Sequence, residues 1–227
     1  MGSKKSQYIF CLICMVTCLQ ICSLVFSQRP DIDSMLRALK TAKEDTNKVY
    51  KLNDLSWALS RSDPDTAIVI SKTALSLAEK QKWDIGIADS YHQIAWANYL
   101  QGNYLLSIEN NLKALKIRET LKDNQGIAIS LGNIANIYVQ QGDETKALEY
   151  YLKALKTFEY VGDKNKIAAC LGNIGIIYDD RGEDSTALIY YFKALKINEG
   201  IGNNNYMATN LINIGSVYKD KGDFPAH

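Results

Sequence analysis

The sequence is short of the residues that interrupt helices or build reactive centres. Only three prolines occur, at Pro30, Pro64 and Pro225, which leaves room for long helices because proline breaks a helix interior. Acids and bases nearly balance, at 25 and 26, so we expect no nucleic-acid partner. There are only two histidines and neither a phosphate-binding glycine loop nor a His-Glu-x-x-His motif, so we expect no enzyme, cofactor or metal site.

Cysteine is also nearly absent outside the N-terminal segment. Of the five cysteines, all but one lie close to the N-terminus, at Cys11, Cys14, Cys18 and Cys22. We interpret these four as small apolar residues rather than a redox or metal site. The remaining Cys170 cannot form an internal disulfide, so oxidation would add no cross-link to the rest of the chain.

The N-terminal segment has the pattern of a secretory signal peptide. Lys4 and Lys5 precede an uncharged run over residues 8–26, and a mature start at Gln28 is expected. Residues 1–27 are therefore predicted to be a signal peptide, and the protein to be exported to the periplasm or the cell exterior. The alternative is an uncleaved inner-membrane anchor over residues 8–26, because about 20 apolar residues span a bilayer.

The dominant pattern is a repeat of constant period. Blocks that start at Ile87, Ile127, Ile167 and Met207 align without a gap, which gives a period of 40. Three columns show it: Ile94, Ile134, Ile174 and Ile214; Ala95, Ala135, Gly175 and Gly215; Gly102, Gly142, Gly182 and Gly222. A period of this length predicts a stack of repeats, each in contact mainly with its neighbours.

Each repeat predicts two antiparallel helices. In the block 127–166, apolar residues recur at helical spacing in two runs: Leu131, Ile134, Ala135 and Tyr138, then Ala147, Leu148, Tyr151, Ala154 and Leu155. Gly142 lies between the runs and accepts the left-handed conformation that ends a helix. Small side chains at Ala135 and Ala147 allow the two helices to approach closely.

The repeats divide the remaining chain. Residues 28–46 are expected to form a connector and a capping helix at about 33–43. Residues 47–227 form the array, with units at about 47–86, 87–126, 127–166 and 167–206 and a half unit at 207–227. Asp63 and Pro64 suit the first turn of a helix in the first unit. The half unit lacks its second helix, so we expect a fragment of a longer protein whose uncapped last helix can self-associate.

These columns resemble those of the tetratricopeptide repeat family over about residues 47–227. The 40-residue unit is longer than the usual 34 and resembles that of kinesin light chain and of Leu-Gly-Asn-type spindle adaptors. The leader, the segment 41–53 and the turn at Ser62–Asp65 look most like the extracytoplasmic repeat regions of Bacteroidetes signalling proteins. In those proteins the array commonly precedes a membrane helix and then a histidine kinase, nucleotide cyclase or DNA-binding output.

The resemblance implies an all-α, right-handed superhelical solenoid with a concave groove that binds a protein or an extended peptide. The first helix of each pair lines the groove in this family. The candidate groove residues are Gln93, Trp96, Asn133, Asn136, Gln140, Asn173, Ile176 and Asn213. Asn133, Asn173 and Asn213 form a ladder whose amides can pair with a peptide backbone. Alternatively, these amides bond between neighbouring helices, and the apolar members pack between units.

Two functions follow from these features. The first is a non-catalytic binding scaffold that acts by itself. The second is the truncated sensory N-terminal region of a membrane-bound signalling protein, a histidine kinase or nucleotide cyclase, whose output domain is missing. His92 is expected at the surface or in the groove, and a role in proton transfer would need a partner that the sequence does not show.

Overall fold

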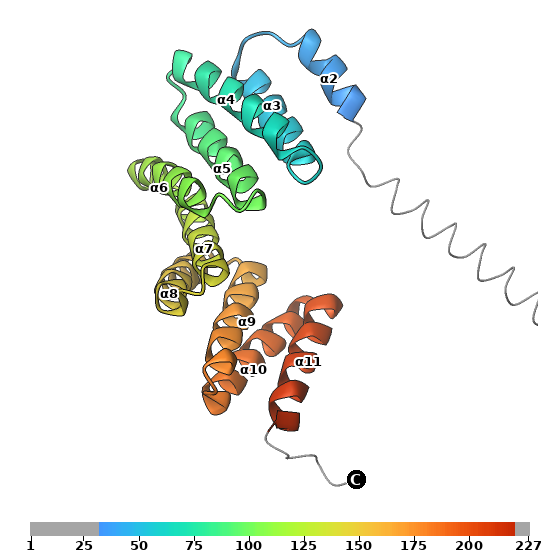
Figure 1. Ribbon diagram of the computed structural model, residues 1–227, viewed down its shortest axis with the longest axis vertical. Coiled ribbons are helices and arrows are strands. Elements are labelled where there is room, and N and C mark those ends of the chain that lie inside the picture. Colours follow the sequence, from blue (N-terminus) through green and yellow to red (C-terminus); the bar gives the residue numbers. More distant parts are fainter. Residues whose placement is uncertain (1–31, 221–227) are drawn as a thin grey trace, which may run out of the picture.

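A computed structural model describes residues 32–220, and within that range the chain folds into ten α-helices without a strand (Figure 1). In chain order the helices are α2 (Ile32–Lys40), α3 (Thr46–Leu59), α4 (Pro64–Lys80), α5 (Asp84–Leu100), α6 (Tyr104–Leu121), α7 (Asn124–Gln140), α8 (Glu144–Val161), α9 (Lys164–Asp180), α10 (Asp184–Ile201) and α11 (Asn204–Asp220). The expected all-helical architecture is confirmed. The predicted leader, the connector at 28–31 and the turn at Gly222 lie outside the described residues.

Successive helices pack as pairs, α3 with α4 through α9 with α10, and α11 packs against α10. The first helices α5, α7, α9 and α11 begin at Asp84, Asn124, Lys164 and Asn204, so their starts keep the period of the sequence. Each starts three residues before the block that the sequence pattern defined. The capping helix α2 lies at Ile32–Lys40 and places Leu39 against a core formed by α3 and α4.

Local sequence signals explain where the helices begin and end. Asp143 accepts a hydrogen bond from the backbone N–H of Lys146 and so caps the first turn of α8. Gly142 has a φ of +72°, in the left-handed region, as expected at the end of α7. Asp63 and Pro64 occupy the predicted capping and first helical positions of α4.

The core runs along the seam of each helix pair and continues between pairs. Ile134 and Ile174 are fully buried, as are Ala135 and Ala147 where α7 meets α8. Burying one large apolar side chain stabilises the fold by about 1.5–3 kcal/mol before entropy is subtracted. Because neither helix of a pair covers its stripe alone, the stack is the stable unit.

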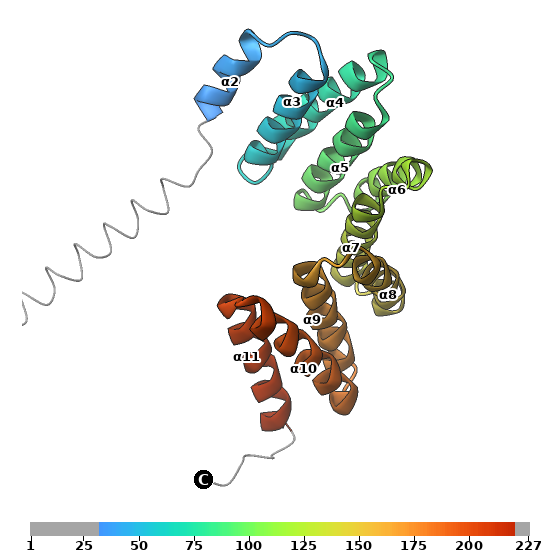
Figure 2. The same ribbon diagram turned by 180° about the vertical axis from the view of Figure 1, so that it is seen from behind.

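The stack bends into an open arc. In both views α6 and α8 lie on the outer side of the bend, and α5, α7 and α9 lie on the inner side (Figures 1 and 2). Across residues 32–220, no helix has the length and apolar character needed to cross a bilayer.

The first unit departs from the constant spacing by one residue. Ser56 donates to the carbonyl oxygen of Ala67, further along the chain by 11, whereas Ser107 donates to the carbonyl oxygen of Ala95, a separation of 12. Ala67 and Ser107 stand one full period apart and occupy the same position in their units. Their bonded partners, Ser56 and Ala95, are therefore also equivalent, although they are separated by one residue less than the period. An alignment of constant period therefore misplaces every residue of α3 by one position.

Candidate functional site

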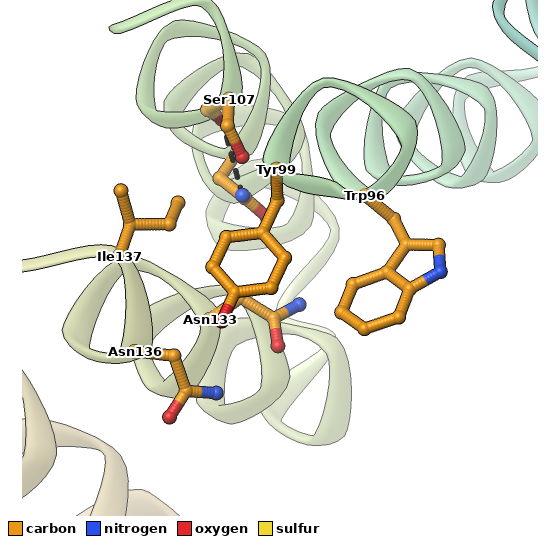
Figure 3. Close-up of a pocket in the computed structure, with 7 residues that line it drawn as sticks. Trp96, Tyr99, Ser107, Asn133, Asn136 and Ile137 are labelled. Atoms are coloured by element: carbon orange, nitrogen blue, oxygen red, sulfur yellow. Dashed lines mark hydrogen bonds between the residues drawn. The ribbon is translucent and has the colours of Figure 1, made fainter. Parts of the chain in front are cut away.

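A hollow of about 280 Å³ opens between α5, α6 and α7 (Figure 3). Its lining consists of aromatic, amide and small side chains: Trp96, Tyr99, Ser107, Asn111, Asn133, Asn136 and Ile137. Three of the predicted groove residues, Trp96, Asn133 and Asn136, therefore meet at one place. We call it the first hollow.

Stacked aromatic rings form one wall of the first hollow. Trp96 lies between Trp57 and Tyr99, with ring centroids 5.3 Å and 5.5 Å away. The Trp96 Nε1–H donates to Ser60 Oγ over 3.0 Å, which fixes the indole across α3 and α5. Trp57 is half exposed and extends the aromatic wall beyond the hollow.

Trp57 was not among the groove residues predicted from the sequence. Trp57 is the counterpart of Trp96 in the first unit, but it precedes Trp96 by one position less than a full period. An alignment of constant period therefore does not place the two tryptophans in one column. The sequence signal for this pairing was the spacing of the two tryptophans, one residue short of the repeat. It is a usable signal because an indole on a first helix is rare in the other units.

A second hollow of about 120 Å³ adjoins the first between α7, α8 and α9, and the two share Asn133 and Asn136. Tyr151 in its lining donates its hydroxyl proton to Asn136 Oδ1 and accepts a hydrogen bond from Asn173 Nδ2. Burial raises the pKa of the Tyr151 hydroxyl, which therefore stays protonated. The hollows are lined by α5, α7 and α9, the helices on the inner side of the arc, and by residues of α6 and α8.

The asparagine ladder has protein partners at two of its three positions. Asn133 Nδ2 lies 3.3 Å from His92 Nδ1, and Asn173 donates to Tyr151. Asn213 is half-buried on α11. These bonds match the alternative in which the amides link neighbouring helices, although each amide can form further hydrogen bonds.

The other predicted groove residues lie outside both hollows. Gln93 is half-buried on α5, and its Oε1 has no hydrogen-bond partner within residues 32–220. Gln140 is exposed at the end of α7, and Ile176 is exposed on α9. The structure thus separates the predicted set into a central group of four, Trp96, Asn133, Asn136 and Asn173, and peripheral members.

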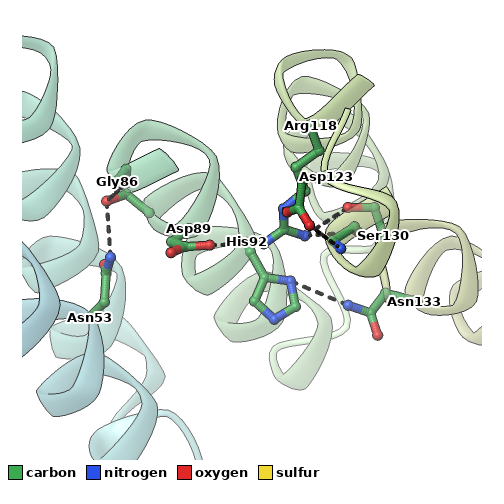
Figure 4. Close-up of polar contacts among 10 residues, drawn as sticks. Asn53, Gly86, Asp89, His92, Arg118, Asp123, Ser130 and Asn133 are labelled. Carbon is green, nitrogen blue, oxygen red and sulfur yellow. Dashed lines mark hydrogen bonds and ion pairs between the residues drawn. The ribbon is translucent and has the colours of Figure 1, made fainter. Parts of the chain in front are cut away.

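A buried arginine lies among the three helices that form the first hollow (Figure 4). Arg118 on α6 is almost fully buried, and its Nη2 donates to Asp89 Oδ1 over 2.9 Å. Its Nη1 donates to Ser130 Oγ over 2.9 Å, and Asp123 lies 3.9 Å from its Nε. These contacts join α5, α6 and α7 through one charged group.

The burial of Arg118 was not predicted from the sequence. The signal was a pair of changes within one unit: Arg118 replaces the Phe158 of the next unit, and Asp89 replaces Ile129. Opposite charges that appear together where the next unit has two apolar residues indicate an internal ion pair.

His92 lies beside Asn133, which lines both hollows. It is half-buried between α5 and α7 and bonds to Asn133, so it supports the site rather than standing free at the surface. Burial, and then the nearby Arg118 charge, lower the pKa of His92 to about 4. The ring is therefore neutral near pH 7.

The described residues carry little reactive chemistry. No group of three His, Cys, Asp or Glu side chains within residues 32–220 is arranged to hold a metal ion. Burial raises the pKa of the Cys170 thiol to about 12, so it is not an activated nucleophile. The site consists of two hollows lined by aromatic rings and side-chain amides.

Comparisons with known proteins agree with this architecture. A tetratricopeptide repeat family model matches residues 86–159 and 126–200, which together span just over half of the chain. No curated protein matches the sequence.

Several solved structures share the fold. BtubC (BKLC) from P. vanneervenii has a TM-score of 0.76 at 23% identity, over 85% of this chain and 84% of that one. A signal transduction ATPase from Pyrococcus horikoshii with a tetratricopeptide repeat sensor has a TM-score of 0.74 at 20% identity, over 86% of this chain and 31% of that one.

A Rap protein complexed with Competence and Sporulation Factor has a TM-score of 0.72 at 16% identity, over 83% of this chain and 57% of that one. At these identities the likeness concerns the fold alone. The family match and the stacked helix pairs agree: the chain belongs to the tetratricopeptide repeat family.

Proposed function

We propose that this chain is a non-catalytic scaffold that binds an extended peptide segment of a partner along the inner side of α5, α7 and α9. The observation that carries the proposal is the continuity of the two hollows, which share Asn133 and Asn136. The Rap protein complexed with Competence and Sporulation Factor supports it, because a similar array there engages another molecule.

The chemistry of this surface suits a peptide backbone. Amide side chains offer both a donor and an acceptor, so they pair with backbone groups without selecting a side chain. Asn136 is exposed and stands at the junction of the two hollows. Trp57 and Trp96 add rigid aromatic area, which is enriched at binding hot spots, and Ile176 adds exposed apolar surface on α9.

Peptide capture with a ladder variant tests the proposal. The chain is immobilised and exposed to a random peptide library, with and without the triple substitution Asn133→Ala, Asn173→Ala and Asn213→Ala. Lys116→Ala, Lys156→Ala and Lys196→Ala form a matched control, because they keep the same spacing on exposed positions of second helices. We expect the ladder variant alone to lose capture. Equal capture by both variants, with unchanged melting temperatures, rules out the ladder as a contact surface.

We further propose that the protein is exported, on the basis of the signal-like pattern of residues 1–27. N-terminal sequencing of the protein recovered from its host checks this, with Gln28 as the expected first residue. A chain that retains Met1 and sediments with membranes would favour the anchor over residues 8–26.

The second candidate function is the sensory region of a larger signalling protein. The Pyrococcus horikoshii ATPase supports it, because a tetratricopeptide repeat sensor there belongs to a much longer chain. The resemblance to Bacteroidetes signalling proteins points the same way. The genomic sequence after His227 tests it: an in-frame membrane helix followed by a kinase or cyclase is the expected result, and a stop codon contradicts it.

Self-association through α11 is a further part of the proposal. Leu211 and Ile212 are 53% and 70% exposed on this helix, and exposed apolar side chains that lie together favour association. Sedimentation of the Ile212→Lys variant, compared with Ile189→Lys on α10 as the control, measures it. We expect only Ile212→Lys to shift the chain towards monomer.

A further inference from the structure

The first hollow lies where the next two units carry a tyrosine ring. Asn111 stands in the repeat column of Tyr151 and Tyr191. Both tyrosines are almost fully buried, and each extends from the second helix of its unit. Tyr191 lies against Gly175 of the facing first helix. Asparagine at this position is too short to fill the same space.

The lining confirms that the hollow and the missing ring coincide. Ser107 and Asn111 line the hollow from α6, and they are the counterparts of Ala147 and Tyr151 on α8. At about 280 Å³ the space is at the lower limit for ligand sites, so it suits a single side chain rather than a whole small molecule.

The polar groups of the hollow indicate what kind of side chain fits. None of the seven lining side chains carries a charge, which favours a neutral occupant. Asn111 is 2% exposed. Its Nδ2 donates to the backbone carbonyl oxygen of Ser107 over 3.1 Å, and its side chain lies within hydrogen-bonding reach of the His92 ring. An amide oxygen carries two lone pairs, so Asn111 can accept a further hydrogen bond from an occupant that brings a donor.

We propose that the first hollow receives the phenol ring of a tyrosine in the bound peptide, an inference that rests on the proposed peptide-binding function. The ring occupies the space that Tyr151 fills in the next unit, but it enters from the inner side of the arc. The hydroxyl of the bound tyrosine is then directed towards Asn111, at the end of the hollow farthest from its opening. The peptide backbone next to it lies near Asn133 and Asn136, whose amides are available at the mouth.

The arrangement of Tyr151 supports this assignment. Its ring is seated between α7 and α9, and its hydroxyl both donates to Asn136 and accepts from Asn173. The chain therefore already contains one phenol in an equivalent space whose hydroxyl is satisfied by amides alone. The first hollow offers the same amide chemistry, with the ring left for the ligand to supply.

Titrations of the full chain followed by NMR test the proposal. The probes are acetyl-Ala-Ala-Tyr-Ala-Ala-amide, the same peptide with phenylalanine in place of tyrosine, and free p-cresol. The signals of the Trp96 indole N–H and of the Asn133 and Asn136 side-chain amides report occupancy. We expect the tyrosine peptide to bind with a dissociation constant of about 1 mM or below, at least about tenfold more tightly than the phenylalanine peptide.

Two substitutions of Asn111 test separately whether the hollow must be empty and whether its amide recognises the tyrosine hydroxyl. Asn111→Tyr restores the ring of the repeat and fills the hollow from within, so we expect binding to fall by at least about tenfold with the melting temperature retained. Asn111→Leu keeps the space open but removes the acceptor, so it should erase the preference for tyrosine over phenylalanine. Leu112→Tyr is the control, because it adds a ring at an exposed neighbouring position.

Equal affinity for the two peptides, or unchanged binding to a folded Asn111→Tyr variant, overturns the proposal. If library capture still depends on the asparagine ladder in that case, the proposed function stands without the tyrosine site. A tyrosine peptide that binds no more tightly than p-cresol shows that the backbone makes no contact. That result overturns the peptide as occupant and removes support from the proposed function itself.

Discussion

The Arg118 guanidinium donates to Asp89 across 2.9 Å and joins α6 to α5 through a buried ion pair. The Arg118 side chain is only 7% exposed, whereas that of Asp89 is 33% exposed. Removing the carboxylate would leave a buried charge with only the more distant Asp123 as an ionic partner. In the next unit the same two positions hold Phe158 and Ile129. Phe158 belongs to the apolar core of that unit, and Ile129 packs against it.

Asp89→Ala should lower the free energy of unfolding by about 2–3 kcal/mol, because it strands a buried charge that stays partly screened. The double variant Asp89→Ile with Arg118→Phe reproduces the apolar pair of the next unit and should recover most of that loss. Urea denaturation measures both, with Glu109→Ala as the control because it breaks only an exposed ion pair with Lys113. A double variant as unstable as Asp89→Ala would contradict the explanation.

Gly175→Ala should destabilise the fold by about 1–2 kcal/mol despite the better helix propensity of alanine. A Cβ at Gly175 would lie 2.6 Å from ring atoms of Tyr191, so the buried ring would have to move. Gly132→Ala is the matched control in α7, where a Cβ meets no atom within 4 Å. That control should raise stability by about 0.5–1 kcal/mol. Thermal and urea unfolding of both variants check the difference in sign.

His92 should make stability depend on pH between about 4 and 6.5. Its pKa falls from the usual 6.5 to about 4 in the folded chain, so the unfolded chain binds more protons within this window. The stabilisation is complete above 6.5 and is lost as the pH falls towards 4. Between pH 7 and pH 5 we expect a loss of about 2 kcal/mol at most.

Urea denaturation of wild type and of His92→Gln at pH 7 and pH 5 checks this. The groups that face His92 are Arg118, Asn111 and Asn133. The variant should show a flatter pH dependence than wild type. The same slope in both chains would show that other groups cause it.

In the monomeric Ile212→Lys variant, helix α11 should be the least protected of the repeat helices in hydrogen exchange. Its Leu211 is 53% exposed, whereas the equivalent Leu131 on α7 is 8% exposed. Fewer buried contacts permit local opening, so amides in α11 should exchange at least about tenfold faster than those near Ile134. Equal protection of the two helices would mean that another copy or another segment covers α11.

Much of the fold could be predicted from the sequence because its causes are local. The two helices around Gly142, the cap at Asp63 and the close approach of Ala135 to Ala147 each depend on residues near one another in the chain. Four of the eight predicted groove residues also fall together, because one helix face and a constant period place them.

The rest of the site depends on contacts between units. The stacking of Trp57 on Trp96 required a one-residue shift in the first unit, which the bonds of Ser56 and Ser107 establish. The partner of His92 is an amide in the following unit, on Asn133, and Arg118 is buried only because three helices converge on it. Side chains on different helices are brought together by packing, which a period does not specify.

The amino-acid order alone determined a stack of paired helices with a repeated inner face, since helical periodicity and turn residues act over a few positions. Only the tertiary structure decided that Asn111 leaves a space where Tyr151 and Tyr191 fill one. The change from tyrosine to asparagine is visible in the sequence, but whether neighbouring side chains close the gap is settled by how α5, α6 and α7 pack.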